Sequence, residues 1–260
     1  MTKKVSMQTI AENTGLSKSV VSRALAGKYG VSEHSKALVW SEAARLGYPL
    51  KAKNMLKLGN NTITVTGDMT SGWIQGGDGD DVITIYGVMA NNSAISGNAG
   101  DDVITVATMT GGGIASGFVG HNTITIGMLN ADSVQGTGGC EIYLQGDSLS
   151  PGSNSLQIDT LSLGGGGYIW VQCNANSSDT IIFSNLDTLS GHGQTMTING
   201  FNGADDYLDL QEVYNSNGWS WNFAQQTATA WSITAFDGAT SMLEIYIYGT
   251  NLDNPAAILV

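Results

Sequence analysis

Two glycine-rich runs in the middle of the chain hold adjacent carboxylates that could bind a hard cation. They read G-G-D-G-D-D-V-I-T at residues 76–84 and G-N-A-G-D-D-V-I-T at residues 97–105. Calcium takes six to eight oxygen ligands, which glycine turns supply as backbone carbonyls and aspartates supply as carboxylates. The candidate ligands, of which Asp81 and Asp102 are the best placed, are Asp78, Asp80, Asp81, Asp101 and Asp102.

Both runs resemble the G-G-x-G-x-D-x-U-x nonapeptide of the RTX family, whose repeats bind calcium. A third run, G-F-V-G-H-N-T-I-T at residues 117–125, fits loosely and places Asn122 in the aspartate position. The resemblance implies calcium as a cofactor. Because the motif occurs only once in every 20–21 residues, we expect one or two calcium sites along one edge. A metal-free ladder of Gly, Asn and Asp turns is the alternative.

A repeat of about 20 residues must position these turns. The first strand of each unit is marked by an isoleucine, namely Ile63, Ile83, Ile104 and Ile124. A methionine or leucine follows in each unit, at Met69, Met89, Met109 and Leu129. A second short strand is marked by Ile74, Ile95, Ala115 and Val134. Two strands and two turns per unit predict a parallel β-solenoid, a β-roll or β-helix with about 20 residues per coil.

The repeat drifts between residues 139 and 195, although alternations such as Leu156/Ile158 still indicate strands. The run M-T-I-N-G-F-N-G-A-D-D-Y-L-D-L at residues 196–210 resembles the segment that closes RTX domains, and the residues after it resemble the capping strands. The tail L-D-N-P-A-A-I-L-V resembles the C-terminal signal of type I secretion substrates. A packed terminal strand is the alternative for this tail.

Charge divides the chain into two parts with opposite electrostatic properties. All 10 lysines and arginines lie between Lys3 and Lys57, together with only 3 of the 22 carboxylates, which gives this part a charge of about +7. Residues 58–260 contain no lysine or arginine and carry the other 19 carboxylates. A cationic segment can approach a polyanion, whereas an anionic one repels polyanions and attracts cations. The pattern predicts two domains.

The basic part has the pattern of three short helices. The first covers roughly residues 7–14 and ends at Gly15. Ser17 is a candidate N-cap for the second, which carries an apolar stripe as far as Leu25. Ser32 is a candidate cap for a third helix, which ends near Gly47. Two short helices joined by a tight glycine turn, with a supporting third, predict a helix-turn-helix.

The local motifs in this part resemble the DNA-binding headpiece of the lac repressor family. They are V-S-M-Q-T-I-A-E-N-T-G-L-S-K-S-V-V-S-R-A-L-A-G at residues 5–27, G-V-S-E-H-S-K at residues 30–36 and A-A-R-L-G-Y-P at residues 43–49. The resemblance implies that the second helix enters the major groove of duplex DNA. By matching positions, Lys18, Ser19 and Ser22 would face base edges, and Ser17 and Arg23 would lie at the groove or phosphates. A three-helix bundle that binds a protein is the alternative.

The chain departs from that family in two places. Residues 49–57 keep basic and apolar residues but not the usual order of the family's hinge helix. The sugar-binding, dimerising domain is not recognised in the sequence, so no effector is carried over. A dimer is compatible with the resemblance but is not predicted by it.

Several classes of protein are disfavoured by the composition. With no lysine or arginine after residue 57, a lyase that needs a basic group is not expected, and we predict no enzymatic activity. Cys140 and Cys173 are predicted to be buried free thiols. No run of 18 apolar residues exists and no apolar run follows Lys3 and Lys4, so neither a membrane span nor a Sec signal peptide is expected.

The sequence therefore predicts an α + β chain, with a three-helix DNA-binding head at residues 1–50 and a basic linker or hinge at 51–57. Solenoid repeats follow at 58–199, and a capping segment at 200–260. The predicted function is that of a transcription-regulator-like protein that binds double-stranded DNA through residues 1–57 and carries an acidic, calcium-binding solenoid. Such a protein would be cytoplasmic. The alternative is a calcium-binding matrix or adhesion protein, exported by type I secretion.

Overall fold

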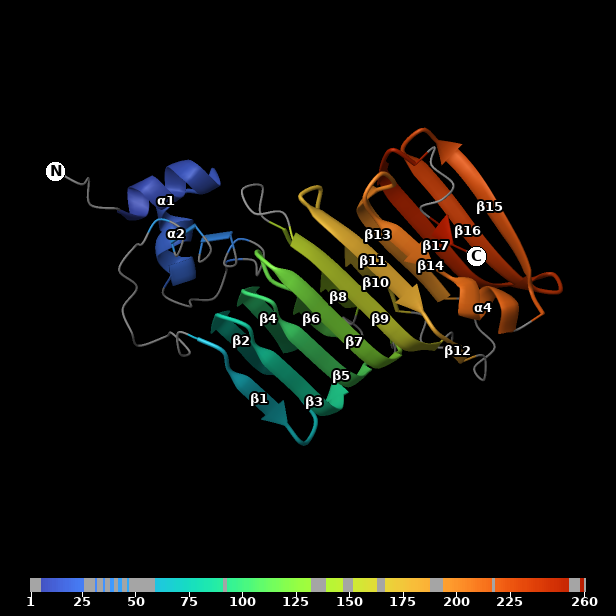
Figure 1. Ribbon diagram of the computed structural model, residues 1–260, viewed down its shortest axis with the longest axis horizontal. Helices are drawn as coiled ribbons and strands as arrows, with labels where there is room; N and C mark the ends of the chain where they lie inside the picture. Colours follow the sequence, from blue (N-terminus) through green and yellow to red (C-terminus); the bar gives the residue numbers. More distant parts are fainter. Residues whose placement is uncertain are drawn as a thin grey trace. The chain divides into compact units, whose positions relative to one another are not determined.

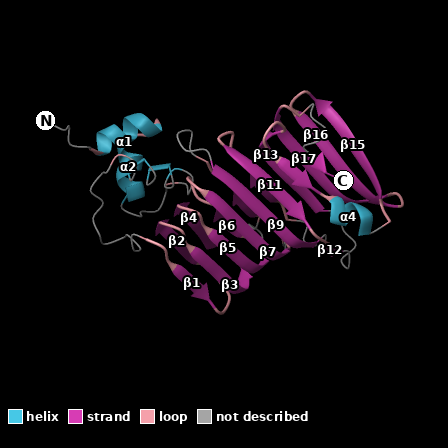
Figure 2. Ribbon diagram, in the orientation of Figure 1, coloured by secondary structure: helices cyan, strands magenta, loops and turns pink. Residues whose placement is uncertain are grey.

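The computed structural model describes residues 6–25, 31, 35, 38–39, 42–43, 46, 59–90, 93–131, 139–146, 152–162, 167–187, 194–216, 218–252 and 258–259. Contacts within the chain divide it into two compact units, Met1–Leu58 and Gly59–Val260. We call them the head and the β unit. Strands dominate the described residues, as Figure 2 shows.

One sheet of the β unit, sheet A, has nine strands, and all its pairings are parallel. Its order is β1-β3-β5-β7-β9-β11-β14-β18, with β12 paired to β9. The strands are β1 (Thr62–Val65), β3 (Val82–Met89), β5 (Val103–Met109), β7 (His121–Leu129), β9 (Gly152–Ser162), β11 (Ser177–Phe183), β12 (Leu186–Asp187), β14 (Tyr207–Asp209) and β18 (Ile258–Leu259).

The other sheet, sheet B, also has nine strands, in the order β15-β16-β17-β13-β10-β8-β6-β4-β2. The strands are β2 (Gly72–Asp78), β4 (Ser93–Ala99), β6 (Gly112–Ala115), β8 (Cys140–Tyr143), β10 (Ile169–Gln172), β13 (Gln194–Asn202), β15 (Ser220–Thr227), β16 (Ala230–Asp237) and β17 (Thr240–Thr250). The pairings are parallel from β2 to β17, whereas β15 and β16 add on as antiparallel strands.

From β1 to β11 the chain alternates between the two sheets, so each pair of strands forms one coil (Figure 1). Side chains of a strand point alternately to its two faces, and the inward ones form a single core of buried Ile, Leu, Val and Met. This parallel, two-sheet arrangement is consistent with the predicted β-solenoid.

The predicted register is confirmed in sheet A. Ile63 pairs with Ile83, Ile83 with Ile104, and Ile104 with Ile124. In sheet B the prediction that Ala115 continues the row of Ile74 and Ile95 is wrong, because Ile95 pairs with Ile114. Ile114 is fully buried, because its larger apolar side chain fills the core better than that of Ala115. This coil is therefore one residue shorter than predicted. Val134 lies outside the described residues.

The C-terminal part ends the regular coiling. The strand predicted around Leu156/Ile158 is β9. Helix α4 (Gln211–Ser216) follows β14, and two antiparallel strands then complete sheet B. Within the predicted tail, β18 pairs with β14 through Leu208 and Ile258. The tail thus contains a paired strand, as its alternative interpretation predicts.

The head contains two described helices. Helix α1 (Met7–Thr14) has Ser6 as its N-cap, and Gly15 ends it with a φ of 68°. Helix α2 (Lys18–Leu25) begins after Ser17, whose hydroxyl accepts the backbone N–H of Val20 at 3.3 Å. Both helices contribute to one small core, formed by Ile10, Ala11, Val21, Ala24, Val31, Val39 and Ala43.

The predicted third helix is described only in part. Ser35, Leu38, Val39, Glu42 and Ala43 are helical, whereas Ser32, Gly47 and residues 47–57, which include the predicted linker, lie outside the described residues. None of the described helices is long and apolar enough to cross a membrane.

Candidate metal centre and nucleic-acid interface

A ladder of buried carboxylate and amide side chains runs along the turns that precede the strands of sheet A. Asp81 Oδ1 accepts the backbone N–H of Asn61 at 2.7 Å, and Asp102 Oδ1 accepts the backbone N–H of Asp81 at 2.9 Å. Asn122 Oδ1 in turn accepts the backbone N–H of Asp102 at 3.0 Å. Each side chain therefore satisfies a backbone donor of the preceding coil, which an apolar side chain could not do.

The ladder continues past the regular repeats into residues that the sequence did not suggest. Asn122 Nδ2 donates to Asn154 Oδ1 at 3.1 Å, and Asn154 Nδ2 donates to Asp179 Oδ1 at 2.7 Å. The backbone N–H of Asp179 donates to Asp206 Oδ1 at 2.8 Å. A sequence signal existed: every member stands two residues before a buried apolar residue of sheet A, as Asp81 stands before Ile83 and Asp206 before Leu208.

The remaining predicted ligands lie outside this ladder. Asp80 and Asp101 are exposed and form a parallel row in which the backbone N–H of Asp101 donates to Asp80 Oδ1 at 2.9 Å. Asp101 Oδ1 accepts the backbone N–H of His121 at 2.7 Å. Asp78 is half-buried at the end of β2. The structure thus brings Asp81, Asp102 and Asn122 into one line and places the other three candidates around it.

Among the described residues, Asp81 Oδ2 and Asp102 Oδ2 are buried without a hydrogen-bond partner. Glycines make room for them. A Cβ on Gly76 would collide with Asp81 Oδ2 and approach the carbonyl oxygen of Gly97. A Cβ on Gly97 would collide with Asp102 Oδ2 and the carbonyl oxygen of Ser116. Each unpartnered carboxylate oxygen therefore lies in a narrow space next to another acceptor.

The cost of burying this charge is visible in the pKa of Asp102. Burial raises that pKa to about 7, and the hydrogen bond from the backbone N–H of Asp81 opposes the rise. The neighbouring carboxylates of Asp81, Asp80 and Asp101 raise it further. Residues 58–260 contain no lysine or arginine, so no ammonium or guanidinium group of the β unit can neutralise the Asp102 carboxylate.

The oxygen atoms around Asp81 and Asp102 are of the type that calcium binds. Carboxylate and carbonyl oxygens are the ligands that calcium prefers, and the spaces beside Gly76 and Gly97 are bordered by both. Oδ1 of Asp81 and of Asp102 is used in the ladder, so Oδ2 would be the ligand atom. The side-chain oxygen of Asn122, the third predicted ligand of the ladder, already accepts the backbone N–H of Asp102.

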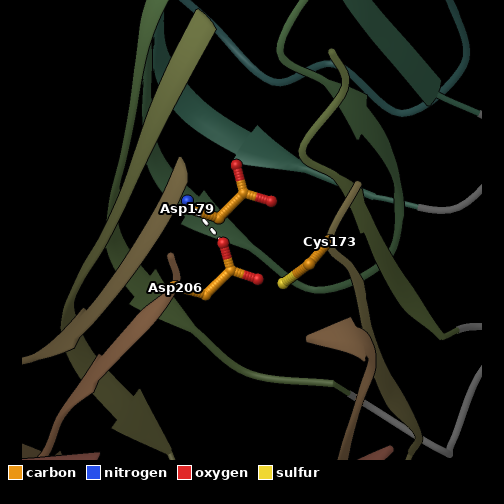
Figure 3. A group of neighbouring side chains, drawn as sticks. All are labelled: Cys173, Asp179 and Asp206. Atoms are coloured by element: carbon orange, nitrogen blue, oxygen red, sulfur yellow. Dashed lines mark hydrogen bonds between the residues drawn. The ribbon is translucent and has the colours of Figure 1, made fainter. Parts of the chain in front are cut away.

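A second acidic group lies further along the ladder, shown in Figure 3. Atoms of Cys173, Asp179 and Asp206 lie within 4.8 Å of one another, and all three residues are buried. Burial raises the pKa of Asp179 to about 6 and that of Asp206 to about 7. It also raises the pKa of the Cys173 thiol well above its usual value.

This group could hold a metal, but each of its carboxylate oxygens already accepts a hydrogen bond. Asp179 Oδ2 accepts the backbone N–H of Asn174 at 3.1 Å, and Asp206 Oδ2 accepts that of Asn202 at 2.8 Å. Cys173 and Cys140 are both free and buried, as predicted. A protonated thiol among hydrogen-bonded carboxylates explains the group without an ion.

The predicted DNA-contacting residues are all exposed, four of them on α2 and Ser17 just before it. The buried side consists of Val21 and Ala24. The exposed residues are Ser17, Lys18, Ser19, Ser22 and Arg23. The Ser17 and Ser19 hydroxyls lie 2.9 Å apart at the N-terminus of the helix. Helix α2 therefore exposes hydroxyls, an amine and a guanidinium, while Val21 and Ala24 pack in the head's core.

The β unit belongs to a recognisable class, an acidic and mostly parallel β protein with a ladder of Asp and Asn side chains along one edge. The head adds a short helix with a polar, basic face. A scan against protein-family models matches no family, and no curated protein or solved structure was found to be similar. The resemblances to the lac repressor and RTX families therefore stay predictions.

Proposed function

We propose that this chain is a DNA-binding protein of the transcription-regulator type, with an acidic β unit that serves as a calcium-binding scaffold. The observation that carries the proposal is the exposed face of α2. Lys18, Ser19, Ser22 and Arg23, four of the five residues that the sequence motif selects for DNA contact, are exposed on this helix. Ser17 is exposed just before it, and Val21 and Ala24 pack in the head's core.

The chemistry of this face suits duplex DNA. A lysine amine donates to guanine O6 and N7 in the major groove, and serine hydroxyls donate to or accept from base edges. The backbone N–H groups at the N-terminus of a helix attract phosphate, and Arg23 adds a positive charge at the other end of α2. The surplus of basic residues in residues 1–57 supports association with a polyanion.

Selection of duplexes from a random pool by the full chain tests this function. The proposal predicts enrichment of one short sequence and protection of its major groove. Failure to enrich any sequence over several rounds, at low salt and with folded protein, would contradict it.

The calcium part of the proposal rests on different atoms. Asp81 Oδ2 and Asp102 Oδ2 are buried without a donor among the described residues, in a unit whose sequence carries 19 carboxylates and no lysine or arginine. A divalent cation would offset the free-energy cost of desolvating these carboxylates and would reduce the repulsion between them. The exposed carboxylates of Asp80 and Asp101 would assist by attracting the ion.

This same observation supports a second candidate function, a calcium-binding matrix or adhesion protein exported by type I secretion. Calcium concentrations outside a cell would fill weak sites that cytosolic calcium would leave empty. Fractionation of the native host separates the two functions. Detection with the nucleoid supports the regulator, and detection in the culture supernatant supports the exported protein.

A further inference from the structure

One part of the outer face of sheet B is rich in aromatic side chains. Residues that alternate with the buried positions of β8, β10, β13 and β17 face outward. The register places Glu141 beside Trp170 on the neighbouring strand. The outward aromatic residues are Tyr143, Tyr168, Trp170, Tyr246 and Tyr248, of which Tyr168 is 52% and Tyr248 43% exposed. On β4 and β6 of the same sheet, Ala94 and Ala115 flank the buried isoleucines instead, so the aromatic group does not continue onto these two strands.

Glu141 lies among three of these rings. The Tyr143 hydroxyl donates to Glu141 Oε2 at 2.8 Å, and the Tyr168 hydroxyl donates to Oε1 at 3.0 Å. The Tyr168 ring reaches this position across Gly139, where any Cβ would collide with it. The carboxylate is therefore held in place between two tyrosines, with Trp170 on the adjacent strand.

A second carboxylate is held in the same way two strands beyond β10. The Tyr246 hydroxyl donates to Glu244 Oε2 at 3.0 Å, and the Ser241 hydroxyl donates to Oε1 at 3.2 Å. Both carboxylates belong to an E-I-Y run, at residues 141–143 and 244–246. They are separated by three strand spacings and one side-chain repeat, roughly 16 Å. That is farther than the paired carboxylates of glycoside hydrolases, at most about 9.5 Å, so the pair suits binding rather than catalysis.

The positive charge that these carboxylates lack must come from outside the β unit. Residues 58–260 contain no lysine or arginine and carry a charge of −19, from the 22 carboxylates less the 3 in the basic part. The faces of tyrosine and tryptophan rings attract cations, most strongly ammonium groups. A carboxylate bordered by such rings therefore favours an organic cation over a bare metal ion.

We propose that this face binds a linear polyamine. One ammonium group lies at Glu141 among Tyr143, Tyr168 and Trp170, and another lies at Glu244 beside Tyr246. The chain between them crosses β10 and β13, a distance that a tetra-amine such as spermine spans. Hydrogen bonds from ammonium groups to carboxylates are charge-assisted, and the aromatic rings provide both contact area and cation–π attraction. This site uses other residues than the calcium ladder and the proposed DNA contact.

Isothermal titration calorimetry of the full chain with spermine, at physiological ionic strength, tests the proposal. We expect saturable binding of one spermine per chain. Glu141→Gln and Trp170→Thr should each weaken it about tenfold, and the double variant Glu141→Gln, Glu244→Gln should remove the saturable phase. The matched control is Glu212→Gln, which removes the same charge from an exposed position on α4 and should leave the affinity unchanged. Unchanged melting temperatures establish that the variants are folded.

Three results would overturn the proposal. An equal loss in Glu212→Gln would mean that spermine acts only as a diffuse counterion. Displacement of spermine by magnesium at equal charge concentration would mean that the rings contribute nothing. Retardation of the chain in a gel that contains an uncharged polysaccharide, with no heat from spermine, would assign the face to a glycan instead.

Discussion

At the scale of single residues, Asp102 is a buried carboxylate that is only partly hydrogen-bonded. Its Oδ1 is used by the ladder and its Oδ2 has no donor among the described residues. Either a proton or a cation can remove the resulting electrostatic cost. Burial also raises the pKa of Asp179 and of Asp206, but all four of their carboxylate oxygens accept hydrogen bonds.

In chelator, the melting temperature of the protein should fall as pH rises from about 5 to about 8. Burial raises the pKa of Asp102 and of Asp206 from 3.8 to about 7 in the folded state. Between the ordinary and the raised pKa the folded state holds more protons than the unfolded state, so the free energy of unfolding decreases with pH. This stabilising contribution is complete below pH 3.8 and is lost as pH passes about 7. A melting temperature that rises over this range in chelator would contradict the account.

Calcium should raise the melting temperature at neutral pH, and magnesium should raise it less, because a loose cage of oxygens suits the larger ion. Linkage gives about 2.7 kcal/mol at a calcium concentration 100-fold above the dissociation constant. Asp81→Asn with Asp102→Asn should remove most of this gain while keeping the Oδ1 acceptors. The control pair Asp80→Asn and Asp101→Asn removes the same charge from exposed positions and should lose less. Equal melting of the wild type with calcium, magnesium and chelator would leave only the metal-free ladder.

At the scale of elements, the strands were predictable and part of the polar ladder was not. Regular spacing of about 20 residues revealed the isoleucine rows and the register of sheet A. Beyond Asn122 the ladder residues are separated by 32, 25 and 27 positions, because the intervening loops differ in length. A fixed period therefore does not identify Asn154, Asp179 and Asp206. The prediction that Ala115 is a core residue is wrong for a related reason. This coil is shorter than the period predicts, so Ile114 occupies the buried position.

The later rungs should stabilise the fold as much as the earlier ones. Asn154 Nδ2 donates to the carbonyl oxygen of Gln145 at 2.9 Å and to Asp179 Oδ1 at 2.7 Å. Asn154→Ala leaves these buried acceptors without that donor, which costs about 1–3 kcal/mol. Gln157→Ala, on the other face of β9, is the control and should cost less. Denaturant unfolding measures both variants, and equal losses would show that the ladder has no special role.

Helix α2 should determine which DNA sequence is bound. Lys18→Ala or Ser22→Ala should each relax the sequence preference, at a cost of about 1–3 kcal/mol for a side chain that contacts a base edge. Gln8→Ala, on the exposed side of α1, is the control. Anisotropy titrations with a selected duplex and its single-base variants measure the preference. Unchanged discrimination in both α2 variants would place the interface elsewhere.

At the scale of the whole molecule, the two parts of the chain carry opposite charges. The basic part carries about +7 and the rest −19. Under the proposed function, the β unit opposes loose association with any polyanion, and specific contacts by the head must offset this repulsion. Charge asymmetry was visible in the sequence alone, whereas the polyamine face was not, because it depends on the register of four strands.

Equilibrium binding of the full chain to duplex DNA across a salt series tests the central claim most directly. Affinity should fall linearly on a plot of log K against log salt, because bound counterions are released. Lys18→Ala with Arg23→Ala should weaken binding and reduce the slope by about 0.9 for each phosphate that the variant no longer neutralises. Binding that is absent at low salt, or that has the same slope in the double variant, would contradict DNA binding through α2.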